Sequence, residues 1–220
     1  MLKSPLRRLP AAYARWPTLA MLLALTLWLG TQAGDNRQLY SRNLSPSGLL
    51  SLERAMEVEK AEKILAFWDR WIGRQNVIES LDMVWILLYL LCYSTMLALA
   101  CVIAADRLDS IGQVLEGHYP GHRIIDLTRR VVTVGIWLSW AQVLVVILGL
   151  TEKQLLIRML TPGVPITSGR VFLIGVLTDI QLLLRLIAIV YTALGAAVYF
   201  LLFFAWPRLL DRSRHEQECL

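Results

Sequence analysis

The chain has 220 residues, of which 56% are hydrophobic and only 18% are charged, and its mean hydropathy is +0.54. Because soluble domains average about 45–50% apolar and about 25% charged residues, this composition excludes an ordinary soluble domain. The net charge of +5 comes from basic residues spread along the chain, without the basic face and interleaved aromatic residues typical of nucleic-acid binding.

Four long runs without a charged residue predict four transmembrane helices. At 1.5 Å per residue each run spans roughly 28–35 Å, which is close to the thickness of the hydrocarbon core of a bilayer. We therefore predict an all-α integral membrane protein. An N-terminal anchor helix lies in 1–34, and three further spans lie in 81–220, at about 81–105, 131–151 and 178–206.

The first run has two interpretations. Basic residues precede it, among them Lys3, Arg7 and Arg15, and this fits an anchor that stays in the protein. The core "TLAMLLALTLWLG" followed by "TQAGD" also fits a secretory signal peptide. We predict a retained anchor because the run is long enough to span the bilayer; a cleaved peptide would leave three spans and an external N-terminus.

The same basic residues set the predicted orientation. Lys and Arg favour the cytoplasmic side, which places both termini in the cytoplasm. The segment 35–80 and the loop 152–170 then lie outside, and the loop 106–130 lies inside. We predict an integral protein of the plasma membrane, of the bacterial inner-membrane type, in contact with membrane lipid.

Residues 35–80 predict an external linker followed by an amphipathic helix. The stretch 35–48 is polar and contains Pro46 and Gly48, which interrupt any helical pattern. Between 49 and 77, apolar residues recur at steps of three to five with charged residues between them. The charged face is mixed in sign, whereas helices that lie on lipid are rich in Lys and Arg there, so we expect this helix to pack on protein. Its hypothetical interaction surface consists of Leu52, Met56, Leu65, Trp68 and Ile72.

An apolar stretch, "VFLIGVLT" at 171–178, precedes the last span. If a helix continues unbroken from 171 to Trp206, it is ~54 Å long and protrudes roughly 20 Å from the bilayer. We expect Pro207 to end it. The protruding part needs a cover, and the apolar stripe of the 49–77 helix is the candidate. The predicted fold is thus four transmembrane helices plus an extracytoplasmic amphipathic helix packed on an extended fourth helix.

Small residues on the last span predict close helix packing. Ala188, Thr192 and Ala196 follow the small-xxx-small spacing that lets two helices approach, and Gly195 lies beside them. Arg185 falls on the same face by helical angle.

Asp82 and Arg185 lie at similar depths in the second and fourth predicted spans. Asp82 lies ~36 Å along its helix from Asp106, and Arg185 lies ~35 Å along its helix from Arg208. We hypothesise a structural ion pair between Asp82 and Arg185 that joins the second and fourth spans. The alternative is that each ion reaches water by itself.

Catalytic and cofactor motifs are missing from the sequence. It contains no HExxH, GxSxG, Walker loop or dinucleotide-binding GxGxxG. The spans hold no histidine for haem, and a Pro-Gly turn separates His118 from His122, so we predict neither a cofactor nor a metal site. Few polar residues lie inside the spans, which argues against transport by this chain alone.

The stretch "LERAMEVEKAEKILAFWDRWIGRQNVIESLDMVWILLYLL", Leu52–Leu91, resembles a pattern in small multi-span membrane proteins of unassigned function. In that pattern an external amphipathic helix ends near a Trp and leads into a span that opens with Leu-Asp. The resemblance covers less than a fifth of the chain and implies no activity.

These observations favour a non-catalytic membrane protein: an accessory, assembly or sensory subunit that uses its external helical surface for interaction. The expected partners are other membrane proteins or a second copy of the chain, with no nucleic acid. Two alternatives are a subunit of a transport complex and a membrane enzyme with a site at the outer interface near Asp82 and Arg185.

Overall fold

The computed structural model describes residues 12–41, 52–71, 83–118 and 122–218. Side chains are described over 15–31, 52–70, 83–113 and 126–201. Within these residues the fold is all-helical, as predicted. In chain order the helices are α1 (Ala12–Ser41), α3 (Val58–Trp71), α5 (Met83–His118), α6 (His122–Leu160) and α7 (Ser168–Glu218).

Three of the described helices are long and apolar enough to cross a membrane. They are Met83–Gln113, Asp126–Leu160 and Ser168–Leu201, and they overlap the three later predicted spans. The first predicted span falls in α1, whose side chains are described only over 15–31, so its crossing of the bilayer stays a prediction.

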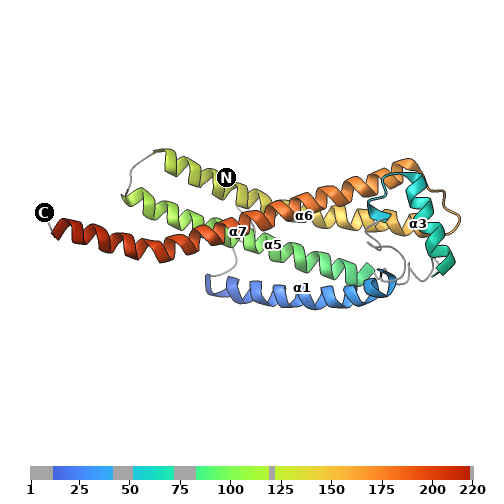
Figure 1. Ribbon diagram of the computed structural model, residues 1–220, viewed down its shortest axis with the longest axis horizontal. Helices are drawn as coiled ribbons and strands as arrows, with labels where there is room; N and C mark the ends of the chain where they lie inside the picture. The colour runs from blue at the N-terminus through green and yellow to red at the C-terminus, as the bar shows by residue number, and fades with distance from the viewer. Residues whose placement is uncertain (1–11, 42–51, 72–82, 119–121, 219–220) are drawn as a thin grey trace.

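The long helices run side by side along the molecule, with successive ones in opposite directions (Figure 1). Helix α1 packs along α5. The pairing is antiparallel, because Arg15 near the start of α1 forms an ion pair with Asp106 of α5. Further along, the rings of Trp28 and Trp85 meet edge to face at 5.8 Å.

Helices α5, α6 and α7 share a tightly packed interior. Cys101, Leu138 and Ala188, one from each helix, form a buried cluster. Gly195 lies so close to α5 that an added Cβ would sit 3.0 Å from that of Ala104. Among the other small residues on α7, the Thr192 hydroxyl donates a hydrogen bond to the Ala188 carbonyl of the same helix over 3.0 Å. Ala196 is exposed.

The helices are longer than the sequence predicts, and the predicted loops are shorter. Most of 106–130 is helical, because α5 continues to His118 and α6 begins at His122. The two extensions support each other: Gly112 of α5 lies directly against Thr128 of α6. On the other side, α6 continues to Leu160, so the loop expected at 152–170 shrinks to 161–167.

Pro207 does not end the last helix, contrary to the sequence-based expectation. Helix α7 continues to Glu218. A proline removes one backbone donor and strains one turn, but it need not stop a helix when good helix formers follow. The residues after Pro207 include Arg, Leu and Glu and no glycine.

The amphipathic helix predicted within 49–77 is interrupted before Val58, while residues 49–51 and 72–77 lie outside the described residues. It spans Val58–Trp71, and Met56 just before it has a φ of 54°, a left-handed conformation that breaks the helical path from Leu52. The break turns residues 52–56 onto α7. Gly175 makes room for them, since a Cβ there would lie 2.9 Å from Met56 Cγ.

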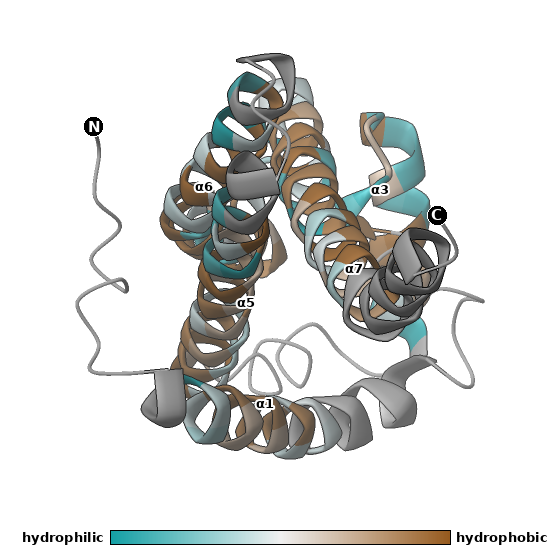
Figure 2. Cartoon of the chain, turned by 90° about the vertical axis from the view of Figure 1, so that its left-hand side faces the viewer, coloured by the Kyte–Doolittle hydropathy of each residue, from teal (hydrophilic) through white to brown (hydrophobic). Residues whose placement is uncertain are grey.

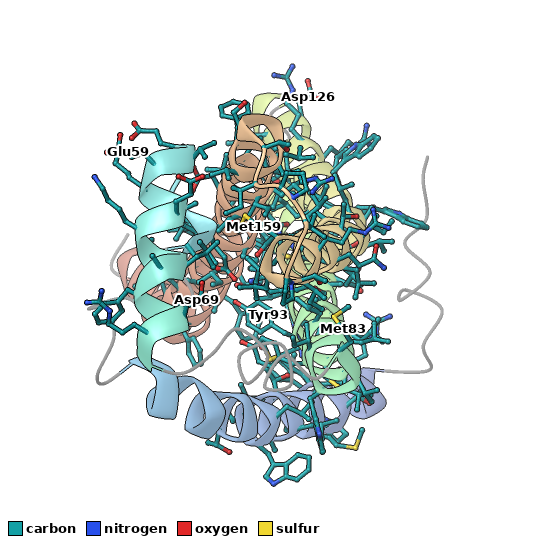
Figure 3. The ribbon with its side chains drawn as sticks, turned by 90° about the vertical axis from the view of Figure 1, so that its right-hand side faces the viewer. Glu59, Asp69, Met83, Tyr93, Asp126 and Met159 are labelled. Atoms are coloured by element: carbon teal, nitrogen blue, oxygen red, sulfur yellow. The ribbon has the colours of Figure 1, made fainter. Side chains whose placement is uncertain are left out.

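Residues 52–71 pack on the ends of α6 and α7, and we call this assembly the head. Its core combines the apolar stripe of α3 with the last turns of α6 and the first turns of α7, as Met159 shows between α3 and the bundle in Figure 3. The buried members are Leu52, Ala55, Ala61, Leu65, Trp68, Leu156, Met159, Leu160, Val171 and Ile174. The start of α7 thus contributes Val171 and Ile174 to this core, whereas Phe172 and Leu173 remain 58% and 43% exposed.

Hydropathy distinguishes α3 from the long helices. Apolar residues predominate on α5, α6 and α7, with hydrophilic segments among them, whereas hydrophilic residues predominate on α3 (Figure 2). Glu59 projects from the side of α3 that faces away from the bundle (Figure 3).

Candidate functional site

A cluster of buried polar side chains lies where the head meets the long helices. Glu53, Glu152, Lys153 and Gln181 are 7%, 3%, 8% and 4% exposed. Ionisable residues are rarely this buried unless they are paired, so the cluster is the strongest candidate for a functional site in the described chain. Together with Arg185 we call these residues the polar cluster.

Lys153 is the centre of the polar cluster. Its Nζ donates one hydrogen bond to Glu53 and another to Glu152 Oε1, the latter over 2.8 Å. The second carboxylate oxygen of Glu152 accepts a hydrogen bond from Gln181 Nε2, which also donates to the Leu177 carbonyl over 3.2 Å. Lys153 therefore joins the head to α6, and Glu152 joins α6 to α7.

Arg185 extends the polar cluster toward α5. Its Nη2 donates to Gln181 Oε1 over 3.3 Å, and its guanidinium lies 5.3 Å from the centre of the Tyr93 ring. The Tyr93 ring in turn stacks on Tyr89 at 5.9 Å. A cation over an aromatic face is attracted by the electrons of the ring. A chain of hydrogen bonds, completed by this cation–π contact, thus runs from the head to an aromatic pair in the N-terminal part of α5.

Local sequence places each member of the polar cluster. Glu152 and Lys153 directly follow the charge-free run of α6, while Gln181 and Arg185 lie one turn apart on one face of α7. Gly149 lets the helices close on them, because a Cβ there would lie 3.0 Å from Gln181 Oε1 and from Leu90 Cδ1. Glu53 enters from the segment before the break at Met56.

The charges of the polar cluster compensate one another. Two carboxylates, Glu53 and Glu152, accompany two cations, Lys153 and Arg185. Burying an ion costs several kcal/mol, and a buried pair recovers that cost only with good geometry and additional hydrogen bonds. The contacts of Gln181 supply such bonds. These contacts join the head, α6 and α7 to one another.

The predicted partner of Arg185 lies outside the described residues. Asp82 belongs to 72–82, so the proposed Asp82–Arg185 pair stays a hypothesis. Among described residues, Arg185 contacts Gln181 and Tyr93.

Most of the predicted interaction surface is used inside the chain. Leu52, Leu65 and Trp68 are buried at 1%, 0% and 4% exposure in the core of the head. Met56 remains 39% exposed. Ile72 falls outside the described residues.

Sequence reasoning missed Glu53, Glu152 and Lys153 as cluster residues. The sequence places Glu53 among the charged residues of the predicted 49–77 helix, and Glu152 and Lys153 at the start of the predicted loop 152–170. A signal was present, because a glutamate and a lysine that directly follow an apolar run must sit at the membrane boundary. Glu53 carried no comparable signal, since its neighbours along the chain do not show that the helix breaks at Met56.

Metal binding finds no support in the described part of the chain, where no group of three His, Cys, Asp or Glu could hold an ion. The side chains of His118 and His122 lie outside the described ones.

No family model, curated protein or solved structure matches this chain. The function proposed below therefore rests on the geometry of the chain itself.

Proposed function

We propose that the chain is a non-catalytic integral membrane protein, an accessory, assembly or sensory subunit that binds another membrane protein, or a second copy of itself, through its head. The observation that supports this proposal is that the charges of the polar cluster compensate one another. Its four ionisable groups are bonded to one another or to Gln181 and Tyr93, so the cluster holds the head on the spans.

The outer face of α3 is the surface that we assign to the partner. Its apolar stripe is already covered by α6 and α7, so its charged residues face outward. The side chains of Glu59, Lys60 and Lys63 are 79%, 61% and 73% exposed, and Phe67 is 38% exposed. A surface of mixed charge with a few exposed apolar residues is typical of non-obligate protein interfaces.

The proposed topology has four spans, with α1 as the first and the head outside the cell. Antiparallel packing of α1 on α5 supports this, because the Arg15–Asp106 pair sets the beginning of one apolar run beside the end of the other. Both termini then lie in the cytoplasm, in a plasma membrane of the bacterial inner-membrane type, with lipid around the bundle.

A subunit of a transport complex is the second candidate. It is favoured by one observation: the polar cluster continues as a chain of hydrogen bonds from the head into the outer end of the spans. A membrane enzyme with its site near Asp82 and Arg185 is the third candidate, and the Nε of Arg185, which has no hydrogen-bond partner among described atoms, supports it.

The test is purification of the full chain in a mild detergent, followed by identification of copurifying proteins. We expect a stable partner that is lost in the double variant Glu59→Lys, Glu62→Lys, which reverses charge on the outer face of α3. The matched control is Asp126→Lys, an exposed carboxylate at the start of α6. If the partner survives the α3 variant but is lost with Arg185→Gln, the transport alternative replaces this proposal.

A further inference from the structure

A groove between α5 and α6 lies at mid-depth of the predicted spans. Its volume is about 280 Å³. Ser94 on its α5 wall is midway between Asp82 and Asp106, and Gln142 on its α6 wall is near the middle of the run between Arg130 and Glu152. Anything that enters this groove therefore comes from the hydrocarbon core.

Two polar side chains at the groove have no hydrogen-bond partner among the residues that the structure describes. Gln142 is 1% exposed, and neither its Nε2 nor its Oε1 is bonded. Ser94 is 3% exposed, and its Oγ is also unbonded. In the hydrocarbon core no water replaces the missing partners, so unsatisfied groups are costly and point to a bound group that completes them.

The lining defines the chemistry of the occupant. None of the ten lining residues is ionisable, so a charged headgroup would find no counter-ion. The rim is apolar and open to lipid, with Leu91, Val143 and Ile147 exposed by 43%, 53% and 55%. The occupant must therefore have an apolar body and one uncharged polar group that can both donate and accept, as the amide of Gln142 requires.

Size favours a small molecule over a protein helix. A transmembrane helix with its side chains is about 10–12 Å wide and would rest on the rim, where it could not reach the buried amide of Gln142. A hydroxyl on a chain or ring can enter a groove of this volume.

We propose that this groove binds an uncharged lipid-soluble alcohol or phenol. Its hydroxyl oxygen accepts a hydrogen bond from Gln142 Nε2 after the amide turns into the groove, and its hydroxyl hydrogen is donated to Ser94 Oγ. The apolar remainder lies along Leu91, Val143 and Ile147 and continues into the bilayer. This site is separate from the head and does not depend on the function proposed for it.

The test uses a dodecanol that carries a photoreactive diazirine and an alkyne, with the full chain in phosphatidylcholine vesicles. After irradiation we expect label on α5 and α6 peptides that line the groove. Excess dodecanol should compete and dodecane should not, because the alkane lacks the hydroxyl. A decyl hydroquinone competitor distinguishes the two sources of the hydroxyl: weaker competition than by dodecanol supports a chain alcohol, and stronger competition supports a phenol.

Two variants and one control make the result specific. Gln142→Leu and Ser94→Ala should each lower labelling about five- to tenfold, as expected for loss of one hydrogen bond of about 1 kcal/mol. Gln154→Leu, an exposed glutamine on the same helix, should leave labelling unchanged. Without the probe, Gln142→Leu should raise the unfolding midpoint by about 2–4 °C, because an unsatisfied amide is removed.

Three outcomes would overturn the proposal. Equal competition by dodecane would show a merely apolar groove. Unchanged labelling in both Gln142→Leu and Ser94→Ala would show that their polar groups are not involved. A cysteine at Val143 that crosslinks to a second polypeptide, with no competition by dodecanol, would show that the occupant is a helix.

Discussion

At the scale of single residues, Lys153 decides how the head is attached to the spans. Its ammonium lies between two buried carboxylates that come from different parts of the chain, Glu53 and Glu152. Without this cation the two carboxylates would face each other in a medium of low polarity. Removal of one member of a buried ionic network is therefore far more costly than removal of an exposed charge.

We expect Lys153→Met to destabilise the protein by about 3–5 kcal/mol, because it leaves buried carboxylates without a cation. Thermal unfolding in detergent measures the effect. The control is Lys63→Met, which breaks an exposed pair with Glu59 worth about 0.3–0.5 kcal/mol. A loss in Lys153→Met no larger than that in the control would show that the carboxylates are relieved in another way.

At the scale of elements, α3 depends on its neighbours for its structure. Helices of fewer than about 12–15 residues are marginal in water by themselves, and α3 has 14 residues. Its order therefore comes from the apolar stripe buried on α6 and α7. The long helices differ, because a helix that crosses a bilayer has to bond its backbone groups internally.

Leu65→Ala tests this dependence. Leu65 is fully buried in the head, and truncation of a buried leucine costs about 2–5 kcal/mol. We expect faster amide hydrogen exchange across 58–71, with exchange in α5 and α6 unchanged, since the damage is local. Phe67→Ala, at a side chain that is 38% exposed, serves as the control. Equal protection of α3 in both variants would contradict the role assigned to its apolar stripe.

At the scale of the whole molecule, the antiparallel bundle separates two chemically different ends. One end carries the head and the polar cluster, and the other carries the end of α5, the start of α6 and the C-terminal part of α7 (Figure 1). If α1 spans the bilayer, the number of spans is even and both termini lie on one side.

Cysteine labelling in intact cells tests this topology. In a variant that lacks Cys92, Cys101 and Cys219, a cysteine at Glu59 should react with a membrane-impermeant maleimide, and one at Gln113 should react only after the cells are opened. The intact mass of the purified chain shows whether 1–34 is retained. Labelling of both positions from outside would refute the proposed orientation, and a mass without 1–34 would leave three spans.

The sequence by itself determined that the chain is helical and where three of its membrane-length helices lie. Charged residues do not enter hydrocarbon without a large cost, so Asp106, Arg130 and Glu152 mark the ends of apolar runs whatever the rest of the fold does. That constraint is local and can be read from composition alone.

Only the tertiary structure decided the break at Met56, the continuation of α7 past Pro207 and the composition of the polar cluster. Beyond the apolar runs, hydropathy no longer sets where a helix ends, and packing on neighbouring helices sets it instead. Glu53 and Lys153 are 100 positions apart, and no periodicity along the chain relates them. They meet because burial of the α3 stripe brings residue 53 to the end of α6, where the ammonium of Lys153 compensates the charge of its carboxylate.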